Sequence, residues 1–149
     1  MSAARMTPRA RAYMTICALR HLLLGLMCVV RPGDFTSPSY DGVKAVLPVP
    51  PDAALITWGV AFVLVALVAV HAAVTGSEES ARHALTGSVV VTAMWVGGFV
   101  WSILTGSLVG WSGVIVWTAL AAKDLTMLRD PLRNPFEDLI RTDPAGTEG

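Results

Sequence analysis

Apolar residues gather along this chain in four stretches, each close to the length that crosses a membrane as a helix. The stretches cover about residues 12–30, 53–74, 84–104 and 109–127. About 20 apolar residues in a row cross the hydrocarbon core of a bilayer. Backbone polar groups cannot stay unpaired in lipid, and the alternation of a membrane β-strand is missing from the sequence, so helices are predicted. The pattern therefore predicts an all-α fold, a transmembrane four-helix bundle.

The ends of the second and third spans carry boundary residues. The second span follows Pro51 and ends before Gly76. Ser77 has the residue type of an N-cap, and Glu78 places an acid in the first turn of the third span. Glu78 and Arg82 lie four residues apart, a spacing that favours an ion pair on a helix.

The apolar stretch that begins at residue 84 continues to residue 122, which is too long for a single crossing. A break is predicted at residues 105–113, where Gly106, Gly110 and Gly113 stand among serines. We therefore expect a tight hairpin between the third and fourth spans.

The first span is divided by Arg20 and His21, and it has a second interpretation. An Arg-rich start followed by residues 22–30 also fits the n-region and h-region of a secretory signal. Arg31 and Pro32 come next, without a small-x-small cleavage site. We expect a retained membrane span, with an unusual signal sequence as the alternative.

A short interfacial helix is predicted in the loop between the first two spans. Ser37 has the type of an N-cap, and Pro38 that of a first helical residue. The next residues place an apolar face on one side of a helix: Tyr40, Val43, Val46 and Leu47. We expect this helix to lie on the outer membrane surface.

The chain divides into a membrane domain, residues 1–129, and a cytoplasmic tail, residues 130–149. In the tail, Asn134 and Pro135 precede Glu137 in the arrangement of a capping box, so a short amphipathic helix is predicted there.

Basic residues predict the orientation of the spans. Of the 11 basic residues, all but Arg31 and Lys44 fall on the side of the two termini, if Arg20 is counted with the first segment. Cytoplasmic segments are enriched in Lys and Arg. Both termini are therefore expected in the cytoplasm, in a protein of the inner membrane.

Composition and charge exclude several classes of protein. The chain is 54% hydrophobic and only 15% charged, whereas a soluble domain carries about a quarter charged residues. The net charge is zero, so nucleic acid is not an expected partner.

Cys17 and Cys28 lie on one predicted helix about 16 Å apart, too far for a disulfide between them.

An ion pair inside the membrane is the main candidate site. Arg20 is expected about 12 Å from the cytoplasmic end of its helix, where an unpaired Arg costs roughly 2.5–3.5 kcal/mol. Asp124, near the cytoplasmic end of the fourth span, lies at a compatible depth. We predict that Arg20 and Asp124 pair, chiefly for structure; a gate or a ligand counter-ion is the alternative.

No catalytic, cofactor or metal site is predicted. His21 and His71 fall in the cytoplasmic half of different spans, and such a pair could hold a haem or a metal ion. However, the sequence has neither a His pair on one helix nor an accompanying carboxylate motif, and Ser and His are not arranged with an acid. We expect a protein that is not an enzyme and has no cofactor.

Small residues recur at the four-residue spacing that lets membrane helices pack closely. They form two sets: Ala93 with Gly97, and Ser102 with Gly106 and Gly110. The sets predict helix packing within the chain, with self-association as the alternative.

Three stretches together carry a resemblance: residues 20–26 (RHLLLGL), residues 31–40 (RPGDFTSPSY) and residues 123–136, which begin with Lys-Asp-Leu. With them the chain resembles small four-span membrane proteins encoded by phages of actinobacteria, some of which are thought to be holins. Holins associate with one another and permeabilise the inner membrane so that a lytic enzyme escapes. The resemblance implies a homo-oligomer with this function.

Two other functions stay open. Many holins end in a strongly basic tail, whereas the segment from Lys123 onward has four basic and six acidic residues. An accessory or structural membrane protein that binds a partner through its tail or outer loop is therefore the alternative function. A haem-binding redox bundle is a more distant third.

Overall fold

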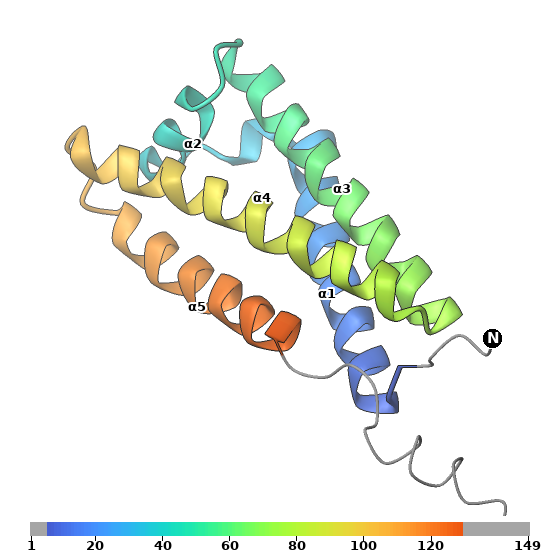
Figure 1. Cartoon of the computed structure of the whole chain (residues 1–149). Coiled ribbons are helices and arrows are strands. Elements are labelled where there is room, and N and C mark those ends of the chain that lie inside the picture. The colour runs from blue at the N-terminus through green and yellow to red at the C-terminus, as the bar shows by residue number, and fades with distance from the viewer. Residues whose placement is uncertain (1–5, 130–149) are drawn as a thin grey trace, which may run out of the picture.

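The computed structural model describes residues 6–129 of the chain, and these residues form helices and turns without a regular strand (Figure 1). The elements in chain order are α1 (Pro8–Val30), the 3-10 turns η1 (Pro32–Asp34) and η2 (Pro38–Tyr40), α2 (Asp41–Ala45), α3 (Pro51–Thr75), α4 (Glu78–Leu104) and α5 (Gly110–Arg129). The all-α prediction is thus confirmed for the described residues. The predicted tail helix lies outside them.

Three helices, α1, α3 and α4, are long and apolar enough to cross a membrane. They contain the predicted spans 12–30, 53–74 and 84–104. α5 covers the predicted fourth span, 109–127, but it does not belong to this set of three. Lys123 and Asp124 shorten its apolar part. A crossing by α5 therefore stays a prediction.

The helix ends follow from local sequence. Thr7 caps α1 by accepting a hydrogen bond from the Ala10 amide, with Pro8 in the first turn. Ser77 caps α4, as predicted, by accepting from the Ser80 amide. The predicted ion pair between Glu78 and Arg82 is confirmed at 2.9 Å.

A hairpin joins α4 to α5 at residues 105–109, inside the predicted break. Gly106 adopts a φ of 108° there, a conformation that residues with a Cβ rarely take. Gly106 therefore serves the turn, and a side chain added to it would meet open space. The prediction that it packs between helices is wrong, because the residue lies in the turn.

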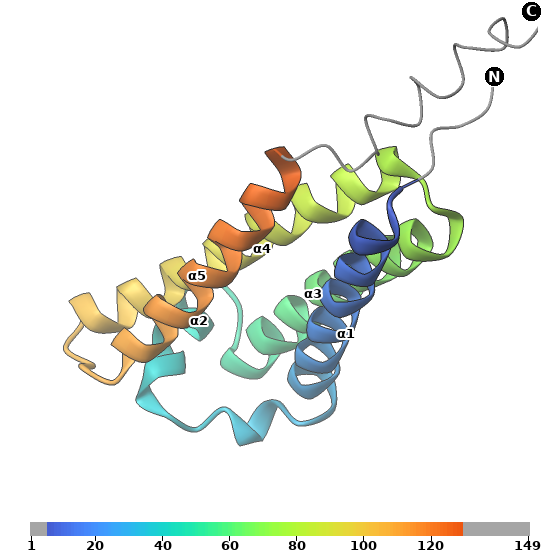
Figure 2. The ribbon, with the colours of Figure 1, turned by 90° about the horizontal axis from the view of Figure 1, so that it is seen from below.

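The helices pack in the order α1, α3, α4, α5, each against the next (Figures 1 and 2). α1 and α3 cross closely at Gly25 and Gly59, where a Cβ built on Gly25 would lie 2.8 Å from the carbonyl oxygen of Gly59. The views show α5 running antiparallel to α4 and opposite α1.

Two apolar clusters form the interior. The first, here called the alanine-rich core, joins α1, α3 and α4 near the chain's N-terminal end and consists of Met6, Ala10, Met14, Ala18, Ala69, Ala72, Ala81, Ala84 and Leu85. The second, here called the aromatic core, lies towards the opposite end and consists of Cys28, Phe35, Val43, Leu55, Trp58, Phe62, Trp95 and Phe99.

The predicted outer helix is present as η2 and α2, but it packs on the bundle. Val43 is completely buried, and the indole N–H of Trp58 donates to its carbonyl at 3.0 Å. Val43, Tyr40 and Leu47 of the predicted apolar face therefore pack on the aromatic side of the bundle, whereas Val46 is exposed. Ser37 caps the segment, as its residue type predicts, by accepting from the Ser39 amide.

Candidate intramembrane polar layer

Asp124 is completely buried although its side chain carries a carboxylate. It projects from α5, and its Oδ2 lies 2.6 Å from Nη2 of Arg20 on α1. The structure therefore brings together the two residues of the predicted ion pair. Burial of an ionised pair is tolerated only when further hydrogen bonds satisfy the remaining oxygens and protons.

Two further side chains complete the surroundings of Asp124. Ser88 on α4 donates to Oδ2 at 2.5 Å, and the Tyr13 hydroxyl on α1 donates to Oδ1. Arg20 also donates to Ser88 Oγ at 3.0 Å. Both carboxylate oxygens are thus hydrogen-bonded by residues of two other helices.

His21 extends this network from the opposite side of Ser88. Its Nε2 lies 3.0 Å from Ser88 Oγ, and its Nδ1 lies 2.8 Å from the backbone carbonyl of Cys17. The imidazole is almost fully buried and packs against the Phe62 ring, with 5.6 Å between ring centroids. We call Tyr13, Arg20, His21, Ser88 and Asp124 the polar layer.

The polar layer lies between the two apolar cores. Met14 of the alanine-rich core directly follows Tyr13 on α1, and Leu85 precedes Ser88 by three residues, about one turn, on α4. On the other side, the Phe62 ring that contacts His21 belongs to the aromatic core. The layer therefore separates an interior of small side chains from one of rings.

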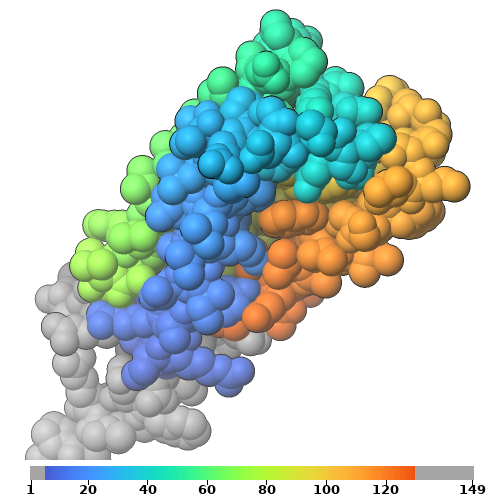
Figure 3. All heavy atoms as spheres, turned by 180° about the vertical axis from the view of Figure 1, so that it is seen from behind, coloured from blue at the N-terminus to red at the C-terminus, as the bar shows by residue number. Residues whose placement is uncertain are grey.

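α5 packs extensively against α4 and contacts α1 through only a few side chains. It packs along α4, with Gly110 and Asp124 as its buried residues. Its contacts to α1 use the polar layer, together with Lys123, whose ammonium lies 5.3 Å from the centre of the Tyr13 ring. Figure 3 shows the surfaces of α1 and α5 meeting along a seam beneath the segment 31–50.

His21 and His71, the two histidines considered above as a pair, lie apart in their surroundings. His21 is engaged in the polar layer, whereas His71 and His83 are exposed. Within residues 6–129, no group of three His, Cys, Asp or Glu side chains could hold a metal ion. Cys17 and Cys28 are both free and buried.

Two of the predicted packing residues do make close contacts. Ser102 accepts from the Gly42 amide at 2.7 Å and donates to the Ser39 carbonyl at 2.9 Å, which fastens the outer segment to α4. A Cβ on Gly110 would lie 3.0 Å from the carbonyl oxygen of Phe99, so α4 and α5 approach closely there.

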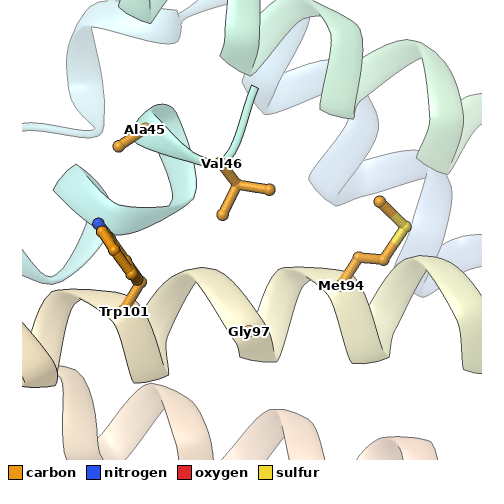
Figure 4. A pocket seen from close by; sticks show the side chains of 5 residues that line it. All are labelled: Ala45, Val46, Met94, Gly97 and Trp101. Atoms are coloured by element: carbon orange, nitrogen blue, oxygen red, sulfur yellow. The ribbon is translucent and has the colours of Figure 1, made fainter. Parts of the chain in front are cut away.

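Ala93 and Gly97 do not pack between helices of the described chain. Both are exposed, and a Cβ on Gly97 would meet nothing within 4 Å. At Gly97, the neighbouring Gly98 takes the inward position, where a Cβ would lie 2.6 Å from the Cα of Val43. Gly97 instead lines an apolar surface hollow of about 390 Å³ with Ala45, Val46, Met94 and Trp101 (Figure 4).

Sequence reasoning missed Tyr13, Ser88 and the role of His21. A helical signal was present on α1, because Tyr13, Cys17 and Arg20 fall at intervals of four and three residues and so share one face. Ser88 carried no signal of its own, since a lone serine in a membrane span is common at helix contacts.

The polar layer can therefore keep an ion pair and hydrogen-bonded protons inside the bundle, on side chains from α1, α4 and α5. Comparison with known proteins does not narrow this chemistry further. No protein-family model, no curated protein and no solved structure matches this chain.

Proposed function

We propose that this chain is a small, non-enzymatic protein of the inner membrane that crosses it four times, with both termini in the cytoplasm. The three apolar helices of membrane length support the location. In this proposal α5 is the fourth crossing, because it runs antiparallel to α4 and returns to the level of α1, where Lys123 reaches the Tyr13 ring.

The charges at the two ends of the bundle support this orientation. At the end with residues 31–52, both basic side chains lie beside an acid: Arg31 is 3.6 Å from Asp34, and Lys44 is 3.7 Å from Asp41. The other end has an excess of bases over the acids Glu78 and Glu79: Arg9, Arg11, Arg82, Lys123 and Arg129. Excess base marks the cytoplasmic side.

Reporter fusions test the topology directly. A reporter placed after Val49 should report the outside, and one at the C-terminus should report the cytoplasm. Equal signals from the two positions would contradict a three-span separation between them and, with it, the four-span proposal.

We further propose that copies of the protein associate and permeabilise the membrane. The observation that carries this proposal is the seam between α1 and α5, where five polar side chains gather within otherwise apolar helices. A water-filled passage through lipid needs a polar lining, and moving α5 away from α1 would turn these side chains towards such a passage.

The cost of such a movement of α5 falls chiefly on the polar layer. Lipid tails are as apolar as the side chains they replace, so the apolar surface of α5 is stabilised equally by lipid and by another helix. Separation from α1 therefore costs chiefly the polar contacts of Asp124. Association of copies then encloses the exposed polar side chains.

Expression in bacteria with a membrane-potential dye tests this function. The wild-type protein should collapse the potential and, with a cytoplasmic lytic enzyme present, lyse the cells. The double variant Arg20→Leu with Asp124→Leu should insert well, since apolar replacement of a buried pair is often neutral or stabilising, but it should permeabilise poorly.

The matched control removes a charge pair outside the polar layer. Arg31→Leu with Asp34→Leu deletes a pair of exposed side chains 3.6 Å apart and should leave permeabilisation unchanged. If well-inserted wild-type protein accumulates while the potential holds, the pore proposal fails. An accessory or structural membrane protein is then the function that remains.

A further inference from the structure

The polar layer has more short polar contacts than its residues have hydrogens in their usual charge states. Nδ1 of His21 lies 2.8 Å from the Cys17 carbonyl oxygen, Nε2 lies 3.0 Å from Ser88 Oγ, and Ser88 Oγ lies 2.5 Å from Asp124 Oδ2. Each contact needs one hydrogen between its atoms. A neutral imidazole and a hydroxyl supply one hydrogen each, and an ionised carboxylate supplies none.

The neighbouring donors do not supply the missing hydrogen. Arg20 Nη2 has two hydrogens, and they are directed at Ser88 Oγ at 3.0 Å and at Asp124 Oδ2 at 2.6 Å. Tyr13 uses its hydroxyl hydrogen on Asp124 Oδ1. The Cys17 carbonyl, 2.8 Å from Nδ1, can only accept, so it fixes the hydrogen of His21 on Nδ1. The Cys17 thiol, whose sulfur lies 3.6 Å from the same nitrogen, then finds no free lone pair there and cannot supply the hydrogen between Nε2 and Ser88.

We infer that the polar layer binds one additional proton, shared along the row His21, Ser88 and Asp124. In one placement, His21 is an imidazolium that donates from Nε2 to Ser88, and Ser88 donates to Asp124. In the other, protonated Asp124 donates to Ser88, and Ser88 donates to neutral His21. Transfer of one proton from His21 Nε2 to Ser88 Oγ and of another from Ser88 Oγ to Asp124 Oδ2 converts the first placement into the second.

Every helix of the bundle contributes to the surroundings of this proton. α4 contributes Ser88, α3 contributes the Phe62 ring, and the titratable or charged groups come from α1 and α5: Tyr13, Cys17, Arg20, Lys123 and Asp124. Arg20 opposes a second positive charge on His21, whereas Asp124 favours it. In both placements Ser88 connects the proton to Asp124. This connection is a role for Ser88 beside a carboxylate that already has Arg20 as its partner.

The inference is independent of membrane permeabilisation, since it concerns the number of protons on three side chains. It touches the proposed function in one respect, since Arg20 and Asp124 of the same layer join α1 to α5, the contact that the proposed opening must break.

Nitrogen NMR combined with infrared spectroscopy tests the inference on the full-length protein in lipid nanodiscs. The chain has three histidines, so His71→Gln with His83→Gln leaves His21 as the one observed. Between about pH 8 and about pH 5, where histidine ordinarily titrates, we expect either a doubly protonated His21 or a carboxylic-acid band that Asp124→Asn removes. Neutral His21 without that band over the whole range would overturn the inference.

A pair of variants on α4 tests whether the proton is shared through Ser88. Ser88→Ala removes the middle of the row, and this variant should lose the signature seen in the parent protein. Thr92→Ala is the matched control, because Thr92 is equally buried one turn further along and its hydroxyl makes no hydrogen bond to the polar layer. An unchanged signature in folded Ser88→Ala protein would also overturn the inference, and the parent measurement decides the question if that variant does not fold.

Discussion

The two cores of this bundle use opposite kinds of side chain to hold the same three helices. In the alanine-rich core, six of the nine buried residues are alanines, so the backbones of α1, α3 and α4 can approach closely. In the aromatic core, Trp58, Phe62, Trp95 and Phe99 fill the space between helices and support η2 and α2. The helices of the alanine-rich core thus pack by close backbone approach, and those of the aromatic core pack through large side chains between them.

Trp95 shows what bulk achieves in the aromatic core. Its ring is completely buried and lies with centroid distances between 5.3 and 6.3 Å from the rings of Tyr40, Trp58, Phe62, Phe99 and Trp117. These distances are those of favourable tilted and edge-to-face ring pairs. Tyr40 is covered by this packing, and burial raises the pKa of its phenol above the ordinary value.

The difference between the cores explains where the polar layer lies. Alanines leave little room between α1 and α3, while rings leave no polar partner for a charge. At the junction, the long side chains of Arg20 and Tyr13 on α1 reach Asp124 on α5. The polar layer thus lies at the level where neither alanines nor aromatic rings fill the interior of the bundle.

The largest effect is expected from breaking the ion pair that divides the two cores. Asp124→Ala leaves Arg20 without its carboxylate, and loss of one partner of a buried pair costs about 3–5 kcal/mol. Arg20→Ala should also be harmful, but the double variant should be less harmful than the sum of the two. Unfolding in mixed micelles, followed by tryptophan fluorescence, measures all four proteins. Additive losses would contradict a direct interaction between the two residues.

Truncating the central ring should destabilise the aromatic core next most strongly. Trp95→Ala removes the contacts to five rings and leaves a cavity, at a cost of about 3 kcal/mol. The same unfolding assay should show a small change for Trp95→Phe, because the indole N–H of Trp95 has no hydrogen-bond partner among the described residues. A larger loss for Trp95→Phe than for Trp95→Ala would show that the ring contacts are not what stabilises this core.

A larger side chain should destabilise the alanine-rich core, because its residues are mostly alanines and already have the smallest apolar side chain. Ala72 is completely buried between α1, α3 and α4, and Ala72→Leu should cost about 1–3 kcal/mol by forcing the helices apart. The matched control is Ala61→Leu, since Ala61 is on the same helix but only partly buried. Equal stability of the two variants would mean that the approach of the backbones is not a constraint at this end.

The helices of this fold could be predicted from the sequence, because runs of apolar residues, prolines and an N-cap serine act locally. Arg20 and Asp124 were also predictable as partners, since each is a charge that lipid would penalise. Ser88 and Tyr13 were not, because only the position of α5 beside both α4 and α1 brings them to Asp124. Likewise, the sequence contains Gly97 and Gly98 side by side, and the four-residue spacing pointed to the one that faces outward.

The smallest effect on stability is expected at Gly97, and the neighbouring glycine makes the comparison sharp. Gly97→Leu places a side chain in open space beside the hollow lined by Trp101, so the unfolding free energy should change by less than about 0.5 kcal/mol. Gly98→Ala should be clearly more harmful, since its Cβ would lie 2.6 Å from the backbone of Val43.

Cross-linking in membranes measures a second property of Gly97→Leu, the association of copies. If copies associate through the Gly97 side, Gly97→Leu should reduce cross-linked dimers while leaving the monomer as stable as before, because bulk on an exposed small-residue face prevents helices of two copies from approaching. Undiminished dimers would place the contact between copies on another face, and a destabilised Gly97→Leu monomer would contradict the outward position of this residue.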